Sequence, residues 1–200
     1  MKTRPLRPVR DGLRLVAGAL LCSAGLLAQA AEWTPAVLLE QLAKQKSAQG
    51  TFVEKKYIAL LDKPAESSGT LSFTAPDKLE KRTLKPKPEL MKLDGNQLYI
   101  EQAGKAPMSI ALGSYPEVAA FVDSIRATLA GDRKALEDNF RLALNGSAAQ
   151  WKLILSPRYS RMSDVISRVE ISGSQAEVQK VAFELPDGDR SEMLISRSKP

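Results

Sequence analysis

The sequence predicts an α+β domain built mainly from antiparallel strands. About ten or eleven short segments alternate apolar and polar residues with a period of two, which is typical of strands with one buried face. One helix precedes these strands and one long helix is inserted late, without the strand–helix–strand succession that builds a parallel sheet. The sheet is therefore expected to be mostly antiparallel.

Capping residues indicate where the helices begin and end. Thr34 precedes a proline, which is typical of a helix start, and Gly50 is the expected end of the first helical region. The longest helix has apolar residues at i, i+3, i+4, i+7 and i+11, and Gly131 follows it as a C-cap. Asp132 is the expected N-cap of a short helix. The helices are predicted over residues 34–47, 116–130 and 132–137.

Turn residues separate the predicted strands. The Asp-Gly pair at 94–95 lies between two strand patterns and is a strong hairpin signal, because glycine accepts positive φ. The Asn-Gly pair at 145–146 and Gly173 are interpreted in the same way, and a Pro-Asp-Gly turn at 186–188 is expected before the last strand. The strands are predicted over 51–61, 68–74, 79–84, 90–93, 97–101, 108–112, 140–144, 151–155, 165–171, 178–185 and 190–196.

Residues 1–30 are expected to be a cleavable secretory signal peptide, followed by a single domain over 31–200. Five basic residues and one acidic residue precede or flank an apolar run of 13 residues, which ends before the small-x-small site Ala28-Gln29-Ala30. The run is shorter than the roughly 20 residues that span a bilayer, so cleavage is preferred over the alternative of an uncleaved anchor. We therefore expect a periplasmic protein without a stable membrane span, cleaved near Ala30.

Composition excludes several function classes. Removal of the signal takes five of 29 basic and one of 23 acidic residues, which leaves 24 against 22 and a net charge of +2. Binding to nucleic acid is therefore not expected. The chain has no histidine, and Cys22, its one cysteine, lies in the signal, which removes Ser-His-Asp and Cys-His catalysis. We expect no enzyme, metal site or cofactor, although carboxylate catalysis by Asp77, Glu80 and Asp94 stays open as an alternative.

The predicted sheet is wider than two helices can cover densely. Such a sheet closes into a barrel or leaves a groove or cavity on its apolar face, and the alternative is a filled core. The bulky side chains expected to line a hydrophobic ligand cavity are Leu71, Phe73, Leu79, Met91, Leu93, Leu98, Ile100, Met108, Ile110, Phe121, Ile125, Leu129, Trp151 and Phe183.

Four motifs follow one another in the first half of the chain. They are Gly-Thr-Phe-Val-Glu at 50–54, Gly-Thr-Leu-Ser-Phe at 69–73, Ala-Pro-Asp-Lys-Leu at 75–79 and Leu-Asp-Gly-Asn-Gln-Leu-Tyr at 93–99. In this order they resemble the LolA family, periplasmic carriers of outer-membrane lipoproteins. The resemblance implies an incomplete, strongly curved half-barrel of about eleven strands with helices over its concave face. It also implies a non-catalytic monomer that takes lipid or lipoprotein cargo from an inner-membrane donor protein to an outer-membrane acceptor protein.

The sequence departs from the family pattern near the third motif. Lys78 stands where the family has an arginine that helps to latch the lid over the cavity, and Lys81 stands where it has an aromatic residue. Lysine lacks the planar, multi-donor fork of arginine, so Lys78 is only a candidate latch. The segment 64–84 looks more like a divergent LolA-related branch associated with aryl polyene or similar lipid-pigment biosynthesis.

These observations lead to one functional hypothesis and one alternative. The hypothesis is a periplasmic carrier that shields acyl, lipoprotein or polyene-lipid cargo, with the helix over 116–130 and the N-terminal helix as lids. The alternative is a non-catalytic envelope scaffold or stress-sensor module with the same half-barrel and a filled core.

The signal peptide generates the first prediction. Export should yield a mature protein that begins at Ala31 or Glu32, because small residues occupy the cleavage site before each of these positions. N-terminal sequencing of the periplasmic protein measures this. An intact Met1, or a lipid attached to Cys22, would contradict the prediction.

Overall fold

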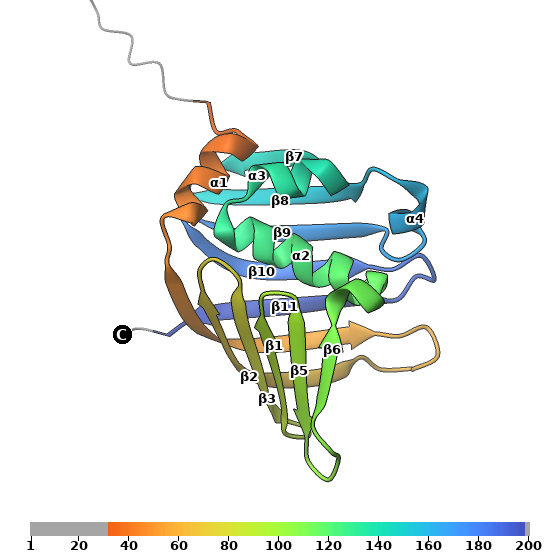
Figure 1. The fold of residues 1–200 in the computed structure, drawn as a ribbon. Helices are drawn as coiled ribbons and strands as arrows, with labels where there is room; N and C mark the ends of the chain where they lie inside the picture. Colours follow the sequence, from red (N-terminus) through yellow and green to blue (C-terminus); the bar gives the residue numbers. More distant parts are fainter. Residues whose placement is uncertain (1–31, 199–200) are drawn as a thin grey trace, which may run out of the picture. The chain divides into compact units, whose positions relative to one another are not determined.

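The computed structural model describes residues 32–198, in which eleven strands form one antiparallel sheet (Figure 1). The strand order is β6-β5-β4-β3-β2-β1-β11-β10-β9-β8-β7, so the first and last strands of the chain pair in the middle. Strands β6 and β7 are the edges and do not pair, which confirms the predicted incomplete barrel. The strands are β1 Ser47–Tyr57, β2 Ala65–Thr74, β3 Lys78–Lys85, β4 Glu89–Asp94, β5 Gln97–Gln102, β6 Met108–Ala111, β7 Phe140–Ser147, β8 Gln150–Pro157, β9 Arg168–Ser174, β10 Glu177–Glu184 and β11 Arg190–Arg197. The predicted signal peptide lies outside the described residues.

Three helices pack together over one face of this sheet (Figure 1). The Thr34 hydroxyl accepts a hydrogen bond from the Val37 amide at 3.3 Å, and the Asp132 carboxylate accepts one from the Ala135 amide at 3.0 Å. Both predicted N-caps are therefore confirmed. The helices are α1 Pro35–Ala43, α2 Pro116–Ala130, α3 Arg133–Asn139, the short α4 Ser160–Ser163 and the 3₁₀ turn η1 Leu112–Ser114. Within residues 32–198, no helix has the length and apolar character needed to cross a membrane.

Helix α2 lies over the sheet because the chain has to travel from one edge strand to the other. Strand β6 ends at one edge and β7 begins at the opposite edge, and η1, α2 and α3 make the whole connection. At 1.5 Å per residue, the 15 residues of α2 span roughly 22 Å. The helix is therefore long enough to cross several strands but not to cover the sheet.

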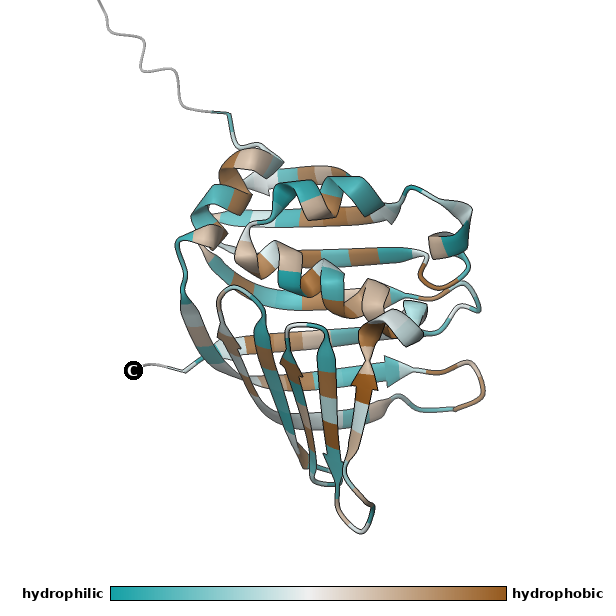
Figure 2. Ribbon diagram, viewed as in Figure 1, coloured by the Kyte–Doolittle hydropathy of each residue, from teal (hydrophilic) through white to brown (hydrophobic). Residues whose placement is uncertain are grey.

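The apolar residues form two separate clusters, and α2 contacts both. Apolar and polar residues alternate along the strands on either side of α2 (Figure 2). The larger cluster joins α1, α3 and β7–β10 and includes Leu38, Trp151 and Ile171. The smaller one joins β4 and β5 to η1, and the first half of α2 packs against it through Val118 and Val122. Between the two clusters, α2 is the one long helix of residues 32–198 that can cover the inner face of the sheet.

Three glycines predicted as turn or stop residues lie inside strands. Gly50 belongs to β1, Gly146 to β7 and Gly173 to β9. A Cβ at Gly50 would lie 2.8 Å from the Ser196 carbonyl oxygen, and one at Gly173 would lie 2.8 Å from a ring carbon of Trp151. A Cβ at Gly146 would meet the Gln150 carbonyl oxygen. These glycines permit a close approach of neighbouring strands, which is the other common reason for glycine in a sheet.

These misassigned glycines explain most of the boundary errors. Helix α1 ends at Ala43 instead of near residue 47, since β1 begins at Ser47 to pair with β2. The β7–β8 turn is made by residues 148–149, after the Asn-Gly pair. Strand β9 begins at Arg168 and not at 165, because the Ile166 amide bonds the Met162 carbonyl in the turn after α4.

The junction of the three helices generates the second prediction. Gly131 has φ +70°, and a Cβ there would lie 2.6 Å from the Ala43 Cβ and also against the Leu39 carbonyl oxygen. Gly131→Ala should lower the free energy of unfolding by about 3 kcal/mol, the sum of left-handed strain and overpacking. Urea denaturation measures this loss.

Gly104 is the matched control for this substitution. Its φ is +78°, and a Cβ at this position would have no atom within 4 Å, so Gly104→Ala adds only backbone strain, about 1 kcal/mol. Equal losses in the two variants would show that the helices do not pack tightly at Gly131.

Candidate functional site

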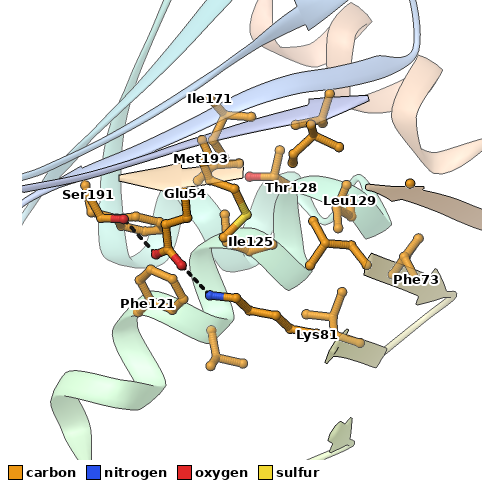
Figure 3. A pocket seen from close by; sticks show the side chains of 18 of the residues that line it. Glu54, Phe73, Lys81, Phe121, Ile125, Thr128, Leu129, Ile171, Ser191 and Met193 are labelled. Atoms are coloured by element: carbon orange, nitrogen blue, oxygen red, sulfur yellow. Dashed lines mark hydrogen bonds and ion pairs between the residues drawn. The ribbon is translucent and has the colours of Figure 1, made fainter. Parts of the chain in front are cut away.

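A partly open cavity of about 550 Å³ lies between α2 and the middle of the sheet (Figure 3). Its wall is largely apolar and comes from β1–β5, β9–β11, α2 and the end of α1. Figure 3 shows Phe121, Ile125 and Leu129 on one side of α2, facing the strands. Phe121 remains 39% exposed, although its ring centroid lies 3.8 Å from that of Phe183 on β10. The bulky helix side chains thus cover the cavity without filling it.

The structure places ten of the fourteen predicted cavity residues on this wall. They come from five strands and from α2, and their side chains share the concave face of the sheet. The ten are Leu71, Phe73, Leu79, Met91, Leu93, Leu98, Phe121, Ile125, Leu129 and Phe183. That these residues bind a hydrophobic ligand stays a prediction.

The other four predicted residues lie outside the cavity wall. Trp151 is buried in the larger cluster, where its Nε1 donates to the Gln175 carbonyl at 2.9 Å. Ile100 and Ile110 pack against the smaller cluster. Met108 is 52% exposed, because β6 is an edge strand. Alternation identified an inward face correctly for most strands but could not show which part of that face the helices cover.

Several lining residues were not predicted, and Glu54 is the most unusual of them. Met193 and Ile171 also line the cavity from β11 and β9. Glu54 is two residues after the buried Phe52 in β1 and is itself only 4% exposed. The period of two already places this carboxylate on the inner face of the strand, so the signal was present in the sequence.

Glu54 is held by partners from three neighbouring strands. Its Oε2 accepts from Lys81 Nζ at 2.5 Å and from the Ser67 hydroxyl at 3.3 Å, and its Oε1 accepts from the Ser191 hydroxyl at 2.8 Å. Lys56 Nζ lies 3.8 Å from Oε1. Lys81 Nζ is also 4.9 Å from the centre of the Phe52 ring, within range of a cation–π contact. The largely apolar wall of the cavity therefore contains a hydrogen-bonded ion pair (Figure 3).

These contacts determine the ionisation of Glu54. Burial alone would raise the pKa of the carboxyl, but the Lys81 ammonium, its hydrogen bond, Lys56 and Ser191 together hold the pKa below its ordinary value of 4.5. Glu54 is therefore an anion at neutral pH.

Arg126 makes a hydrogen bond between α2 and the β4–β5 turn. Its guanidinium donates to the Gly95 carbonyl in the β4–β5 turn at 2.7 Å and pairs with Asp123 at 2.5 Å. Lys78, the predicted latch, bonds Asp94 at 2.9 Å on the neighbouring strand and is 59% exposed. A latch role for Lys78 stays a prediction, and its hydrogen bond runs along the sheet instead of to a helix.

Of the three carboxylates considered for catalysis, Glu80 alone is among the residues that line the cavity, so the three do not converge there. Asp94 is in the surface pair with Lys78, and Glu80 pairs with Arg82 at 3.0 Å and lies 3.9 Å from Lys92. Among residues 32–198, no cluster of three or more His, Cys, Asp or Glu side chains has an arrangement that could hold a metal ion.

Glu54 generates the third prediction. Glu54→Gln should lower the free energy of unfolding at neutral pH by about 3 kcal/mol, because Lys81 loses its charged partner. The folded-state pKa of Glu54 is lowered, so its contribution is present above the ordinary value of 4.5 and is lost as the pH falls through the folded pKa. The gap between the wild type and the variant should therefore shrink in acid, measured by urea denaturation from pH 7 to about pH 3.

Glu192→Gln is the matched control. Glu192 also has a lowered pKa, through its hydrogen bond from Lys180 at 2.9 Å, but the two side chains are 38% and 39% exposed. Its loss should cost less than about 1 kcal/mol. A stability gap for Glu54→Gln that does not change with pH would show that the carboxylate is not ionised in the folded protein.

Comparison with known proteins identifies one family. No curated protein matches the sequence. Among solved structures, a LolA superfamily protein from Nitrosomonas europaea is 12% identical with a TM-score of 0.43, over 84% of this chain and 96% of that chain. A DUF1329 family protein from Desulfovibrio piger is 13% identical with a TM-score of 0.44, over 81% and 88%. A chain of the Pseudomonas aeruginosa MucA/MucB complex is 18% identical with a TM-score of 0.37, over 80% and 55%.

The sequence itself shows the family directly. Residues 27–198, which include every described helix and strand, match the family of outer membrane lipoprotein carrier protein LolA-like sequences. This chain belongs to that LolA-like family.

Proposed function

We propose that this protein is a periplasmic, non-catalytic carrier that shields the acyl chains of a lipid or lipoprotein in the cavity under α2. The observation that carries the proposal is the cavity of about 550 Å³, with largely apolar walls from eight strands and two helices. Membership in the LolA-like family supports the same function. A scaffold with a filled core would not need this space.

The binding energy of such a cargo limits how completely it is buried. One 16-carbon chain gains on the order of 12 kcal/mol, at roughly 0.8 kcal/mol per CH₂. Three fully buried chains would exceed the practical ceiling of about 18–21 kcal/mol for non-covalent binding. A carrier that releases its cargo therefore buries it in part, or uses binding energy to open a lid.

Helix α2 is the proposed lid. Its first half packs on the smaller cluster, its second half packs on the larger one, and Arg126 ties it to the β4–β5 turn. Lifting it would break one charge-assisted hydrogen bond and expose Phe121 and Ile125. In this proposal the Arg126–Gly95 hydrogen bond acts as the latch, a role for which the family resemblance made Lys78 the candidate. The charged donor then lies on the helix and not on the sheet.

Cargo, partners and processing follow as parts of the same proposal. Residues 1–30 direct export and are removed, and residues 31–200 exchange cargo between an inner-membrane donor and an outer-membrane acceptor as a monomer. Lys78 and Lys81 depart from the family pattern, which supports a cargo different from that of typical family members. The lipid pigments of the aryl polyene branch are one such cargo. The ion pair at Lys81 changes the chemistry of the cavity wall, which is where cargo is recognised.

The cavity generates the fourth prediction. Wild-type protein from the periplasm should carry extractable lipid and bind an apolar fluorescent dye stoichiometrically. Phe121→Asp should keep the fold, because position 121 is partly open to water, and should lose both lipid and dye, because a charge in an apolar site is costly. Mass spectrometry of extracted lipid, dye titration and circular dichroism measure the three properties.

Val53→Asp is the matched control. Val53 is 47% exposed in β1, between Phe52 and Glu54 and on the opposite face of the strand, so the same charge there should leave binding unchanged. A Phe121→Asp protein that unfolds would indicate a filled core and the scaffold alternative. A folded variant that still binds lipid would place the cargo elsewhere.

A further inference from the structure

Lys81 brings a positive charge into the apolar cavity. It extends from β3 toward Glu54, below α2 (Figure 3), and its side chain is 22% exposed. Leu71 and Met91, its neighbours on β2 and β4, are both apolar residues of the cavity wall. An apolar side chain at position 81 would continue this wall, so the lysine is the residue that needs an explanation.

The ion pair is not needed to hold the sheet together. Removing two charges from water costs several kcal/mol each, and apolar residues of similar volume often replace a buried ion pair without loss of stability. Strands β1, β2 and β3 are already paired antiparallel, with one register shift between Ser68 and Gly69. A cavity for hydrocarbon alone would gain nothing from a lysine, whereas a few polar groups in an apolar pocket orient a ligand.

Counting donors and acceptors shows which group is free. Glu54 accepts hydrogen bonds from Lys81, Ser67 and Ser191, which use three of the roughly four acceptor sites of a carboxylate. A lysine ammonium has three N–H donors, and the one hydrogen bond that Lys81 makes within residues 32–198 goes to Glu54. Lys81 therefore has two unused donors, against about one unused acceptor site on Glu54, so the larger unsatisfied capacity of the pair is that of a cationic donor.

The charges around the pair also favour an acceptor on the cargo. Lys56 lies 3.8 Å from Glu54, so two ammonium groups surround one carboxylate. A carbonyl oxygen would find a donor in Lys81, and a carboxylate would find a local excess of positive charge. An ammonium group on the cargo would find Glu54 already paired and would face Lys81 with like charge.

We infer that Lys81 binds the acyl oxygen of the cargo, so that the cavity selects long-chain acyl compounds with a carbonyl or carboxylate group. The inference rests on the carrier function proposed above and names the class of ligand that the cavity accepts. Glu54 positions the Lys81 side chain, and Phe52 supports its ammonium from the sheet side. The hydrocarbon chain of the cargo then lies along the apolar wall.

Competition with a bound apolar dye tests this inference. Dodecanoate, methyl dodecanoate and dodecylamine have the same chain and differ in the polar end. The wild-type protein should release the dye to dodecanoate or methyl dodecanoate at concentrations about tenfold lower than to dodecylamine, the effect of one hydrogen bond to a charged group. Dodecanoate as the stronger competitor would indicate a free carboxylate as the cargo group, and equal competition by the ester would indicate a carbonyl. Dodecylamine that competes as well as the acyl compounds would overturn the inference.

The double variant Glu54→Gln with Lys81→Met provides the decisive comparison. It removes both charges of the buried pair together, and Lys56, which also loses Glu54 as a neighbour, keeps a side chain that is 54% exposed to water. The introduced glutamine can still accept from Ser67 and Ser191. The variant should still bind the dye, and the preference for the acyl compounds should disappear, whereas Lys81→Arg should keep it. A double variant with the wild-type preference would refute a role for Lys81.

The outcomes separate this inference from the function on which it rests. Wild-type protein that binds neither dye nor lipid would refute the carrier function. Dye binding and copurified lipid without acyl preference would leave the carrier function intact and refute the role of Lys81.

Discussion

The connection from β6 to β7 is the constraint on which the rest of the structure depends. These two strands are the opposite edges of an eleven-stranded sheet, and the polypeptide between them has to pass over its inner face. The only long helix in the described residues, α2, lies on this path. One helix cannot cover so wide a face, and the apolar residues therefore separate into two clusters with a cavity between them.

The middle of the sheet carries the polar part of this cavity. Strand β1 pairs with both β2 and β11, which brings Ser67 and Ser191 to the two sides of Glu54. Lys81 reaches the same carboxylate from β3, one strand further away. Four strands thus contribute to one ion pair and its hydrogen bonds. The pairing of β1 with β11, the first and last strands of the sheet in chain order, brings Ser191 to this pair.

Two ties of different kinds hold α2 in place. Apolar packing against both clusters extends along the helix, and it weakens gradually as the helix moves away from the sheet. The hydrogen bond from Arg126 to the Gly95 carbonyl is directional and is lost after a small displacement. Such a combination fits the lid proposed above, which has to close in one position and separate at modest cost.

Local signals explain why much of the fold was predictable. Alternation identified all eleven strands, and Thr34, Asp132 and Gly131 marked helix ends that the structure confirms. The errors arose where one residue type serves two purposes. Gly50, Gly146 and Gly173 resemble turn residues in sequence, yet they lie in strands, because only the neighbouring strand reveals that a Cβ would clash.

The sequence by itself determined the fold class, the apolar inner face of the sheet and ten of the residues on the cavity wall, because period and capping depend on neighbours along the chain. The tertiary structure alone decided which part of that face stays open, because this depends on the path of α2 between distant edge strands. It also decided the partners of Glu54, which lie 13, 27 and 137 residues away in the chain. Pairing across such separations is set by strand order and register, which no local pattern contains.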